Sequence, residues 1–178
     1  EKNILQENVG VQDQLAAGVG GLNYMKLSKN GYEISPIEIS KPRKDELEKN
    51  LLLYYTGVSR FATEVLKEQV EKTKEKKVLT ELKDIYDMVQ AGKDILTCDS
   101  VSLLDFGKLL NETWIAKKKL SSAISSSHLD EMYDLAMKSG ATGGKLLGAG
   151  GGGFFLFYEK KEKQLEFREK MSRFVEIP

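Results

Sequence analysis

The sequence predicts an α+β protein in which helices pack on one face of a sheet. Two short apolar runs, at 51–55 and 154–158, have the length and composition of buried strands. Stretches with apolar residues at helical spacing lie between these runs, and another follows the second run. The resulting order of strand, helices, glycine-rich segment, strand and helix favours a layered α+β sandwich.

The N-terminal part predicts a short helix followed by a β-hairpin. Asn8 is a suitable N-cap, the apolar residues from Val11 to Val19 have helical spacing, and Gly20-Gly21 ends the helix. Strands are expected at 22–27 and 32–39, because the intervening turn contains Asn-Gly, a strong hairpin signal. Pro36 predicts that the second strand lies at an edge or is interrupted.

The charged segment 41–49 contains Pro42 and is interpreted as a connection between domains. This interpretation divides the chain into a first part at 1–45 and a second part at 46–178. Beyond it, helical spacing predicts four helices between residues 61 and 140, with Gly92 weakening the end of the second. A last helix is expected to carry one apolar face consisting of Phe167, Met171, Phe174 and Val175.

Composition excludes several classes of partner. The 178 residues are 40% hydrophobic and 30% charged, as in ordinary globular domains. Because 27 basic residues balance 27 acidic ones, no net field attracts nucleic acid or an anionic membrane. Cys98 is the single cysteine, so an internal disulfide is excluded. With no apolar run near 18 residues and no visible signal peptide, we expect a cytoplasmic protein without a membrane partner. The oligomeric state stays open.

The segment 143–153 contains seven glycines in eleven positions. Each glycine costs about 1 kcal/mol relative to alanine in regular structure, so we expect a loop. Successive bare N–H groups can bind an anion such as phosphate. Ser139 and Leu146 break the Walker pattern. The Rossmann fingerprint is rejected because a helical pattern precedes the glycines and a strand follows them. A tight helix-to-strand connection with no ligand is the alternative.

The glycine-rich segment and three further segments together resemble one known protein family. Residues 143–154, Gly-Gly-Lys-Leu-Leu-Gly-Ala-Gly-Gly-Gly-Gly-Phe, resemble the third conserved motif of the GHMP small-molecule kinases. Gly-Val-Gln-Asp-Gln at 10–14 is similar to the stretch that carries the catalytic aspartate in the sugar kinases of this superfamily. Together with 20–24 and 55–60, these segments most resemble the D-glycero-D-manno-heptose phosphate kinases.

The resemblance implies a C-terminal part of such a kinase. Residues 1–45 would be the end of the N-terminal domain, and 46–178 a ferredoxin-like C-terminal domain with helices on an antiparallel sheet. The implied reaction transfers the γ-phosphoryl group of Mg-ATP to a sugar hydroxyl, O-1 of a heptose 7-phosphate. The two upstream family motifs are absent here, so the main ATP-phosphate loop and the Mg²⁺ ligands are expected outside this sequence. We therefore expect no metal ligands here and no ATP turnover by this chain alone.

The resemblance also assigns site residues. Asp13 would be the general base or the group that orients the sugar hydroxyl, a poor nucleophile at neutral pH. The expected substrate-binding residues are Gln12, Thr56, Arg60 and Lys145. The expected phosphate-binding residues are Gly148, Ala149, Gly150, Gly151 and Gly152.

Other interpretations of these residues remain open. Asp13 could merely complement a helix dipole, Thr56 could serve the turn alone, and Arg60 and Lys145 could be solvated charges. His128 is expected to be a cap or surface residue, and Cys98 inert. The rival functions are another GHMP kinase, acting on a galactose- or fucose-like sugar or a mevalonate-pathway substrate, and a noncatalytic α+β anion-binding module.

Overall fold

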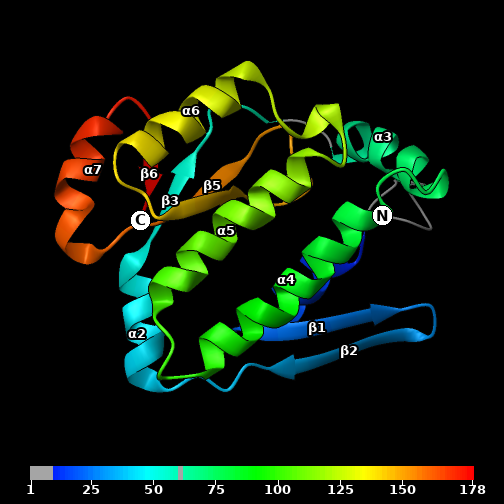
Figure 1. Cartoon of the computed structure of the whole chain (residues 1–178), viewed down its shortest axis with the longest axis horizontal. Coiled ribbons are helices and arrows are strands. Elements are labelled where there is room, and N and C mark those ends of the chain that lie inside the picture. The colour runs from blue at the N-terminus through cyan, green and yellow to red at the C-terminus, as the bar shows by residue number, and fades with distance from the viewer. Residues whose placement is uncertain (1–9, 60–61) are drawn as a thin grey trace.

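The computed structural model describes residues 10–59 and 62–178 (Figure 1). The predicted N-cap Asn8 and the predicted site residue Arg60 lie outside these ranges. Helix α1 (Gln12–Val19) is followed by the antiparallel hairpin of β1 (Asn23–Ser28) and β2 (Gly31–Pro36), in which Ser28 pairs with Gly31. Gly31 has φ +130°, which explains why the hairpin requires glycine there. The predicted helix and hairpin are confirmed.

The segment interpreted as a charged connection is a helix, α2 (Lys41–Asn50). The prediction was wrong because Pro42 was taken as a breaker. Proline is accepted in the first turn of a helix, where its missing N–H has no intrahelical partner to lose. The buried residues of α2 are Arg43, Leu47 and Asn50. The division into parts at residues 45 and 46 stays a prediction.

The main sheet is antiparallel, in the strand order β4-β5-β3-β6. The apolar runs form β3 (Leu51–Tyr55) and β5 (Phe154–Tyr158), as predicted, with Leu53 opposite Leu156. Two further strands were not predicted. Val175, expected on a helix face, begins the short strand β6 (Val175–Ile177), and the first glycines of the glycine-rich segment belong to the edge strand β4 (Gly143–Leu146).

Strand β4 contains glycine because neighbouring groups leave no room for side chains. A Cβ atom on Gly143 would overlap the carbonyl oxygen of Gly107, and one on Gly144 would overlap the ring of Phe157. The actual loop is therefore shorter than predicted, at 147–153. It connects two antiparallel strands, β4 and β5, and so it is not the helix-to-strand connection that the sequence suggested.

The four predicted central helices are confirmed, and the predicted last helix is short. Their bounds are α3 (Ala62–Lys74), α4 (Leu79–Thr97), α5 (Leu103–Lys118), α6 (Ser127–Lys138) and α7 (Gln164–Lys170), with 3-10 turns η1 (Ser122–Ile124) and η2 (Lys161–Lys163). Gly92 does not end α4. It lies where α4 packs on α5, and a Cβ there would come within 3.3 Å of Leu109. None of the described helices has the length and apolar character needed to cross a membrane.

The core lies between the sheet and helices α5, α6 and α7, which Figure 1 shows around the strands. Alternate residues of β3 and β5, including Tyr54, Phe155 and Phe157, are buried on this face. Trp114 of α5 is fully buried and packs edge-on against Phe155, with ring centroids 5.5 Å apart. The predicted arrangement of helices on one face of a sheet is therefore confirmed.

Arg43 attaches α2 to the end of α4. Its side chain is buried, and its guanidinium donates hydrogen bonds to the carbonyl oxygens of Leu96 at 3.1 Å, Ile95 at 2.6 Å and Val101 at 2.7 Å. The last carbonyls of a helix have no intrahelical donor, so Arg43 supplies what the end of α4 lacks. In the same part of the molecule, Leu47 of α2, Leu96 of α4 and Tyr158 of β5 belong to a second hydrophobic cluster.

We expect Arg43→Met to lower the free energy of unfolding by about 3 kcal/mol, because it leaves three carbonyls without their donor. Chemical denaturation measures this change. Lys44→Met is the matched control, since the Lys44–Glu48 pair is exposed and weak at 3.5 Å. Equal stability of the two variants would show that Arg43 adds nothing to the fold.

Candidate functional site

The loop at 147–153, which we call the glycine loop, has a backbone that only glycine adopts easily. Gly148, Gly150 and Gly151 have φ angles of +70°, +121° and +75°. Gly150 also packs against η1, because a Cβ there would lie 3.0 Å from the Cα of Ile124. The glycines thus serve both a left-handed backbone and a close approach to η1.

Two hydrogen bonds fix the far half of the loop. The N–H of Gly151 donates to the carbonyl of Ile124 at 2.9 Å, and the N–H of Gly153 donates to the carbonyl of Val58 at 2.8 Å. Thr56, predicted as a substrate ligand, is buried next to this second contact. Its hydroxyl donates to the carbonyl of Gly153 at 3.0 Å and accepts from the N–H of Gly153 at 3.1 Å. Thr56 is therefore a buried residue whose hydroxyl holds the backbone of the loop at Gly153.

Other N–H groups of the loop have no acceptor among the described residues. Within residues 10–59 and 62–178, those of Gly148, Ala149, Gly150 and Gly152 make no hydrogen bond. Four such donors within five residues meet one requirement of a backbone nest that binds anions, and we call these residues the anion nest. Gly151 differs from its predicted role, because its N–H is already used by Ile124. Gly151 contributes to the nest through its left-handed backbone conformation, with φ +75°.

Lys117, at the end of α5, is a residue that the sequence did not single out. Its Nζ donates to the carbonyl oxygens of Leu146, at 3.4 Å, and Gly148, where the loop begins. The pKa of Lys117 is lowered to about 8, mainly by burial and also by the charge of Lys145, while the charge of Asp13 opposes this shift. Burial also lowers the pKa of Lys145. Of the two lysines, Lys117 therefore contacts the start of the glycine loop directly.

The predicted catalytic residue lies within electrostatic reach of this group. Asp13 is exposed in the first turn of α1, and its negative charge raises the pKa of Lys117, against the lowering by burial. Gln12 is exposed beside it, as the first residue of α1. Lys117 is therefore the residue that connects these predictions, because it contacts the start of the glycine loop and its pKa responds to the charges of Lys145 and Asp13.

No sequence signal identified Lys117. It stands in the run Lys117-Lys118-Lys119 at the end of a helix, where lysines commonly complement the helix dipole. Its position beside the loop depends on how closely α5 approaches β4, which needs glycine at both Gly107 and Gly143. In the sequence, only the glycines at positions 107 and 143 hinted at this close approach of α5 to β4.

We expect the pKa of Lys117 to fall in Asp13→Asn and to rise in Lys145→Met, because the two charges act on it with opposite signs. NMR titration of isotope-labelled lysine measures both changes.

Because the pKa of Lys117 in the folded state, about 8, is below the ordinary 10.5, the folded state binds fewer protons than the unfolded state between these pH values. Lys117 therefore makes the free energy of unfolding increase from about pH 8 to 10.5, and Lys117→Met removes this increase. Lys83→Met, on the exposed side of α4, is the control. Shifts of the same sign would refute this arrangement of charges.

Two other residues considered in the sequence, His128 and Cys98, have contacts that give them no role in the candidate site. The Nε2 of His128, in the first turn of α6, lies 2.8 Å from the carbonyl of Thr56, and its ring packs edge-on against Phe174. Cys98 is exposed, with its Sγ 3.2 Å from the hydroxyl of Ser100. Over the part of the chain that the structure describes, no group of three His, Cys, Asp or Glu residues could hold a metal ion.

Comparison with known proteins identifies relatives of this arrangement. Residues 100–177 match the family described as GHMP kinases C terminal. A D-glycero-alpha-D-manno-heptose 7-phosphate kinase from Campylobacter jejuni is 32% identical over 151 residues, which are 84% of this chain and 44% of that protein. The chain therefore spans less than half the length of this curated relative.

Solved structures agree on the fold. A D-glycero-D-manno-heptose 1-phosphate kinase from Bacteroides thetaiotaomicron superposes with a TM-score of 0.58 at 27% identity, covering 100% of this chain and 48% of that one. The mevalonate kinase of L. major, in complex with R-mevalonate, gives a TM-score of 0.70 at 20% identity, covering 90% and 47%. At that identity the second structure supports the fold alone.

Proposed function

This chain carries the C-terminal domain of the GHMP kinases, and from that premise we propose that it takes part in ATP-dependent phosphoryl transfer to a sugar hydroxyl. The observation that carries the proposal is the electrostatic connection of Asp13 with Lys117, whose ammonium group binds the carbonyls at the start of the glycine loop. In this proposal, the carboxylate of Asp13 and the anion nest lie on the two sides of a reacting phosphoryl group.

In this mechanism, Asp13 orients the sugar hydroxyl and accepts its proton as the new O–P bond forms. The bond between the γ-phosphorus and the bridging oxygen breaks, and ADP leaves. The N–H groups of Gly148, Ala149, Gly150 and Gly152 bind the phosphate oxygens, and Lys117 and Lys145 offset their charge. The described residues form no metal site, so we assign no Mg²⁺ ligand to them and derive no step through the ion.

For the acceptor we propose O-1 of D-glycero-D-manno-heptose 7-phosphate. The support is the heptose 7-phosphate kinase of Campylobacter jejuni, which is 32% identical. Gln12 and, outside the described residues, Arg60 would contact the sugar phosphate. We place the reaction in the cytoplasm, where ATP is available. We further propose that residues 1–178 alone bind phosphate groups without turning over ATP, since the chain matches only 44% of that relative's length.

Two experiments test this function. The first measures ADP release by the complete gene product with heptose 7-phosphate, galactose, fucose and mevalonate in turn. Turnover with heptose 7-phosphate supports the proposed acceptor, turnover with another substrate replaces it, and turnover with none overturns the kinase assignment. The second titrates residues 1–178 with inorganic pyrophosphate and follows amide NMR shifts. Shifts at Gly148, Gly150 and Gly152 support the nest, and their absence supports a purely structural loop.

A further inference from the structure

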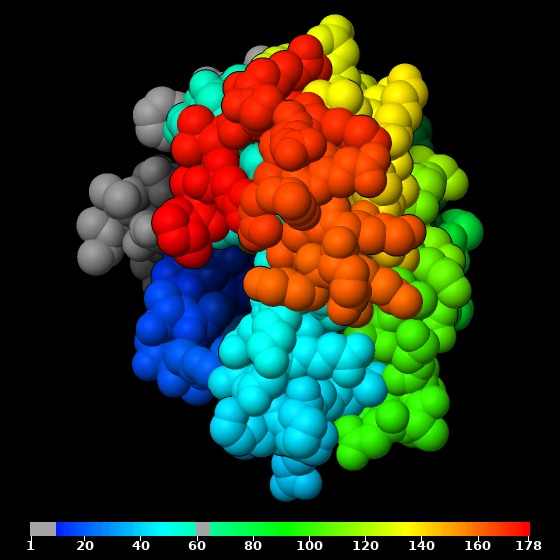
Figure 2. Space-filling model, turned by 90° about the vertical axis from the view of Figure 1, so that its left-hand side faces the viewer, coloured from blue at the N-terminus to red at the C-terminus, as the bar shows by residue number. Residues whose placement is uncertain are grey.

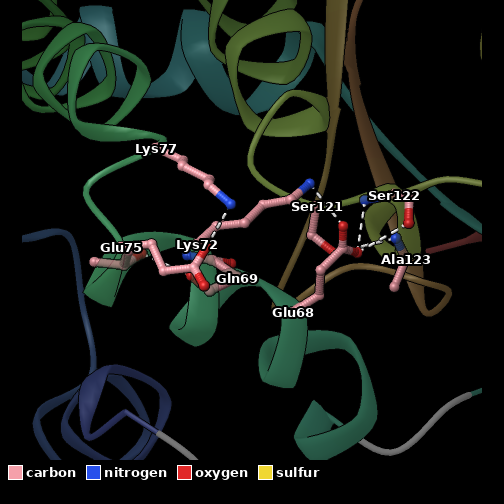
Figure 3. A network of polar contacts seen from close by, with 9 residues as sticks. Glu68, Gln69, Lys72, Glu75, Lys77, Ser121, Ser122 and Ala123 are labelled. Atoms are coloured by element: carbon pink, nitrogen blue, oxygen red, sulfur yellow. Dashed lines mark hydrogen bonds and ion pairs between the residues drawn. The ribbon is translucent and has the colours of Figure 1, made fainter.

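Glu68 of α3 is at the centre of a polar network that no proposed step uses (Figure 3). One carboxylate oxygen accepts three hydrogen bonds, from the hydroxyl of Ser121 at 2.6 Å and from the N–H and hydroxyl of Ser122, each at 2.9 Å. The other oxygen pairs with Lys72 at 2.6 Å. These contacts lower the pKa of Glu68 to about 2, so the group is ionised throughout the neutral range.

The partners of Glu68 begin the turn η1, which supports the glycine loop. Ser121 is buried, and its hydroxyl also caps η1 by accepting from the N–H of Ala123 at 3.1 Å. At the other end of η1, Ile124 is fully buried, accepts the N–H of Gly151 and packs against Gly150. The turn η1 therefore links the two places: its first residue, Ser122, contacts the carboxylate of Glu68, and its last residue, Ile124, contacts the glycine loop.

We propose that Glu68 is a positioning residue for phosphate binding. It holds η1 in place and thereby keeps Gly150 and its neighbours in the conformation that directs their N–H groups toward an anion. The inference rests on the proposed function, because it assumes that the loop binds a phosphate group. Glu68 itself does not contact the anion, and its charge is offset by Lys72 and three hydrogen-bond donors.

The geometry explains why a carboxylate suits this position. The first N–H groups of a helical turn lack intrahelical acceptors, and an anionic side chain satisfies them better than a neutral one. Glutamate from a separate helix also ties α3 to η1, two elements that are more than 50 residues apart in the chain. A loose η1 would remove the carbonyl that fixes Gly151 and the surface against which Gly150 packs.

The test measures the Kd of residues 1–178 for inorganic pyrophosphate by NMR, together with amide hydrogen exchange. We expect Glu68→Ala to raise the Kd about tenfold and Glu68→Gln, which keeps an acceptor oxygen, about threefold. Exchange of the Gly151 N–H should accelerate in both variants, while that of the core residue Phe157 stays constant. A merely structural role would change both exchange rates together and leave the affinity of the folded protein unaltered.

Glu75→Gln is the matched control, because Glu75 lies just beyond the same helix and, among the described residues, its carboxylate pairs with Lys77 alone, at 2.7 Å. Its Kd should equal that of the original protein. If the original protein binds pyrophosphate and Glu68→Ala binds it equally well, the positioning role is overturned. If the original protein does not bind it, the phosphate role of the loop fails first. Should Glu68→Ala not fold, Ser122→Ala replaces it, with an expected threefold rise and the same criterion.

Discussion

Asp13→Asn is expected to lower kcat for phosphoryl transfer by about 10²- to 10⁴-fold in the complete gene product, the range for loss of a general base. Asparagine keeps the size of the side chain but cannot accept the hydroxyl proton. The KM for ATP should change little, because the groups proposed to bind phosphate lie on the glycine loop, Lys117 and Lys145. Asp13 is exposed in the first turn of α1, so the fold should tolerate the substitution.

The control for this prediction is Asp87→Asn. Asp87 lies on α4, pairs with Lys83 and has no described connection with the glycine loop. Its kcat should match that of the original protein. Unchanged kcat in Asp13→Asn would remove the catalytic assignment and leave only a helix-dipole role for this carboxylate.

Gly143→Ala should lower the free energy of unfolding by about 3 kcal/mol, the upper part of the usual range for overpacking. The added methyl group would overlap the carbonyl of Gly107, and it would also lie 3.1 Å from the Cβ of Asn111. Because the first of these groups is backbone, α5 and β4 would have to move apart, and the buried ring of Trp114 would lose contacts. Thermal and chemical denaturation measure the loss.

Gly18→Ala provides the comparison, because among the described residues no atom beyond its chain neighbours and the backbone of α1 lies within 4 Å of a Cβ at that position. It should be neutral or stabilising by up to about 1 kcal/mol. A comparable loss of stability in both variants would show that close packing of α5 on β4 does not explain the glycine at position 143.

The strands that form the centre of the sheet were predictable, because 51–55 and 154–158 are continuous apolar runs with no competing interpretation. The hairpin followed from the turn at Asn30-Gly31. Helix α2 was missed since most of its residues are charged and its contacts come from Arg43, whose carbonyl partners are more than 50 positions away. Such partners are visible only in the folded protein.

Part of the candidate site was equally inaccessible. The glycine-rich segment indicated an anion-binding loop, and the resemblance to a kinase family pointed to Asp13. Strand β4 was missed because glycine disfavours strands in general, whereas here the neighbours Gly107 and Phe157 require it. Lys117 has no signature in the sequence, since its contact with the loop depends on that same close approach.

The attachment of the glycine loop at both sides has a consequence for its evolution. Gly151 is bonded to Ile124 and Gly153 to Val58, so residues two apart are tied to separate elements. One inserted amino acid would shift either donor by about 3 Å and break one tie. Length variation among homologous genes should therefore be confined to surface turns such as 28–31 and 75–77, leaving the spacing between Leu147 and Phe154 invariant.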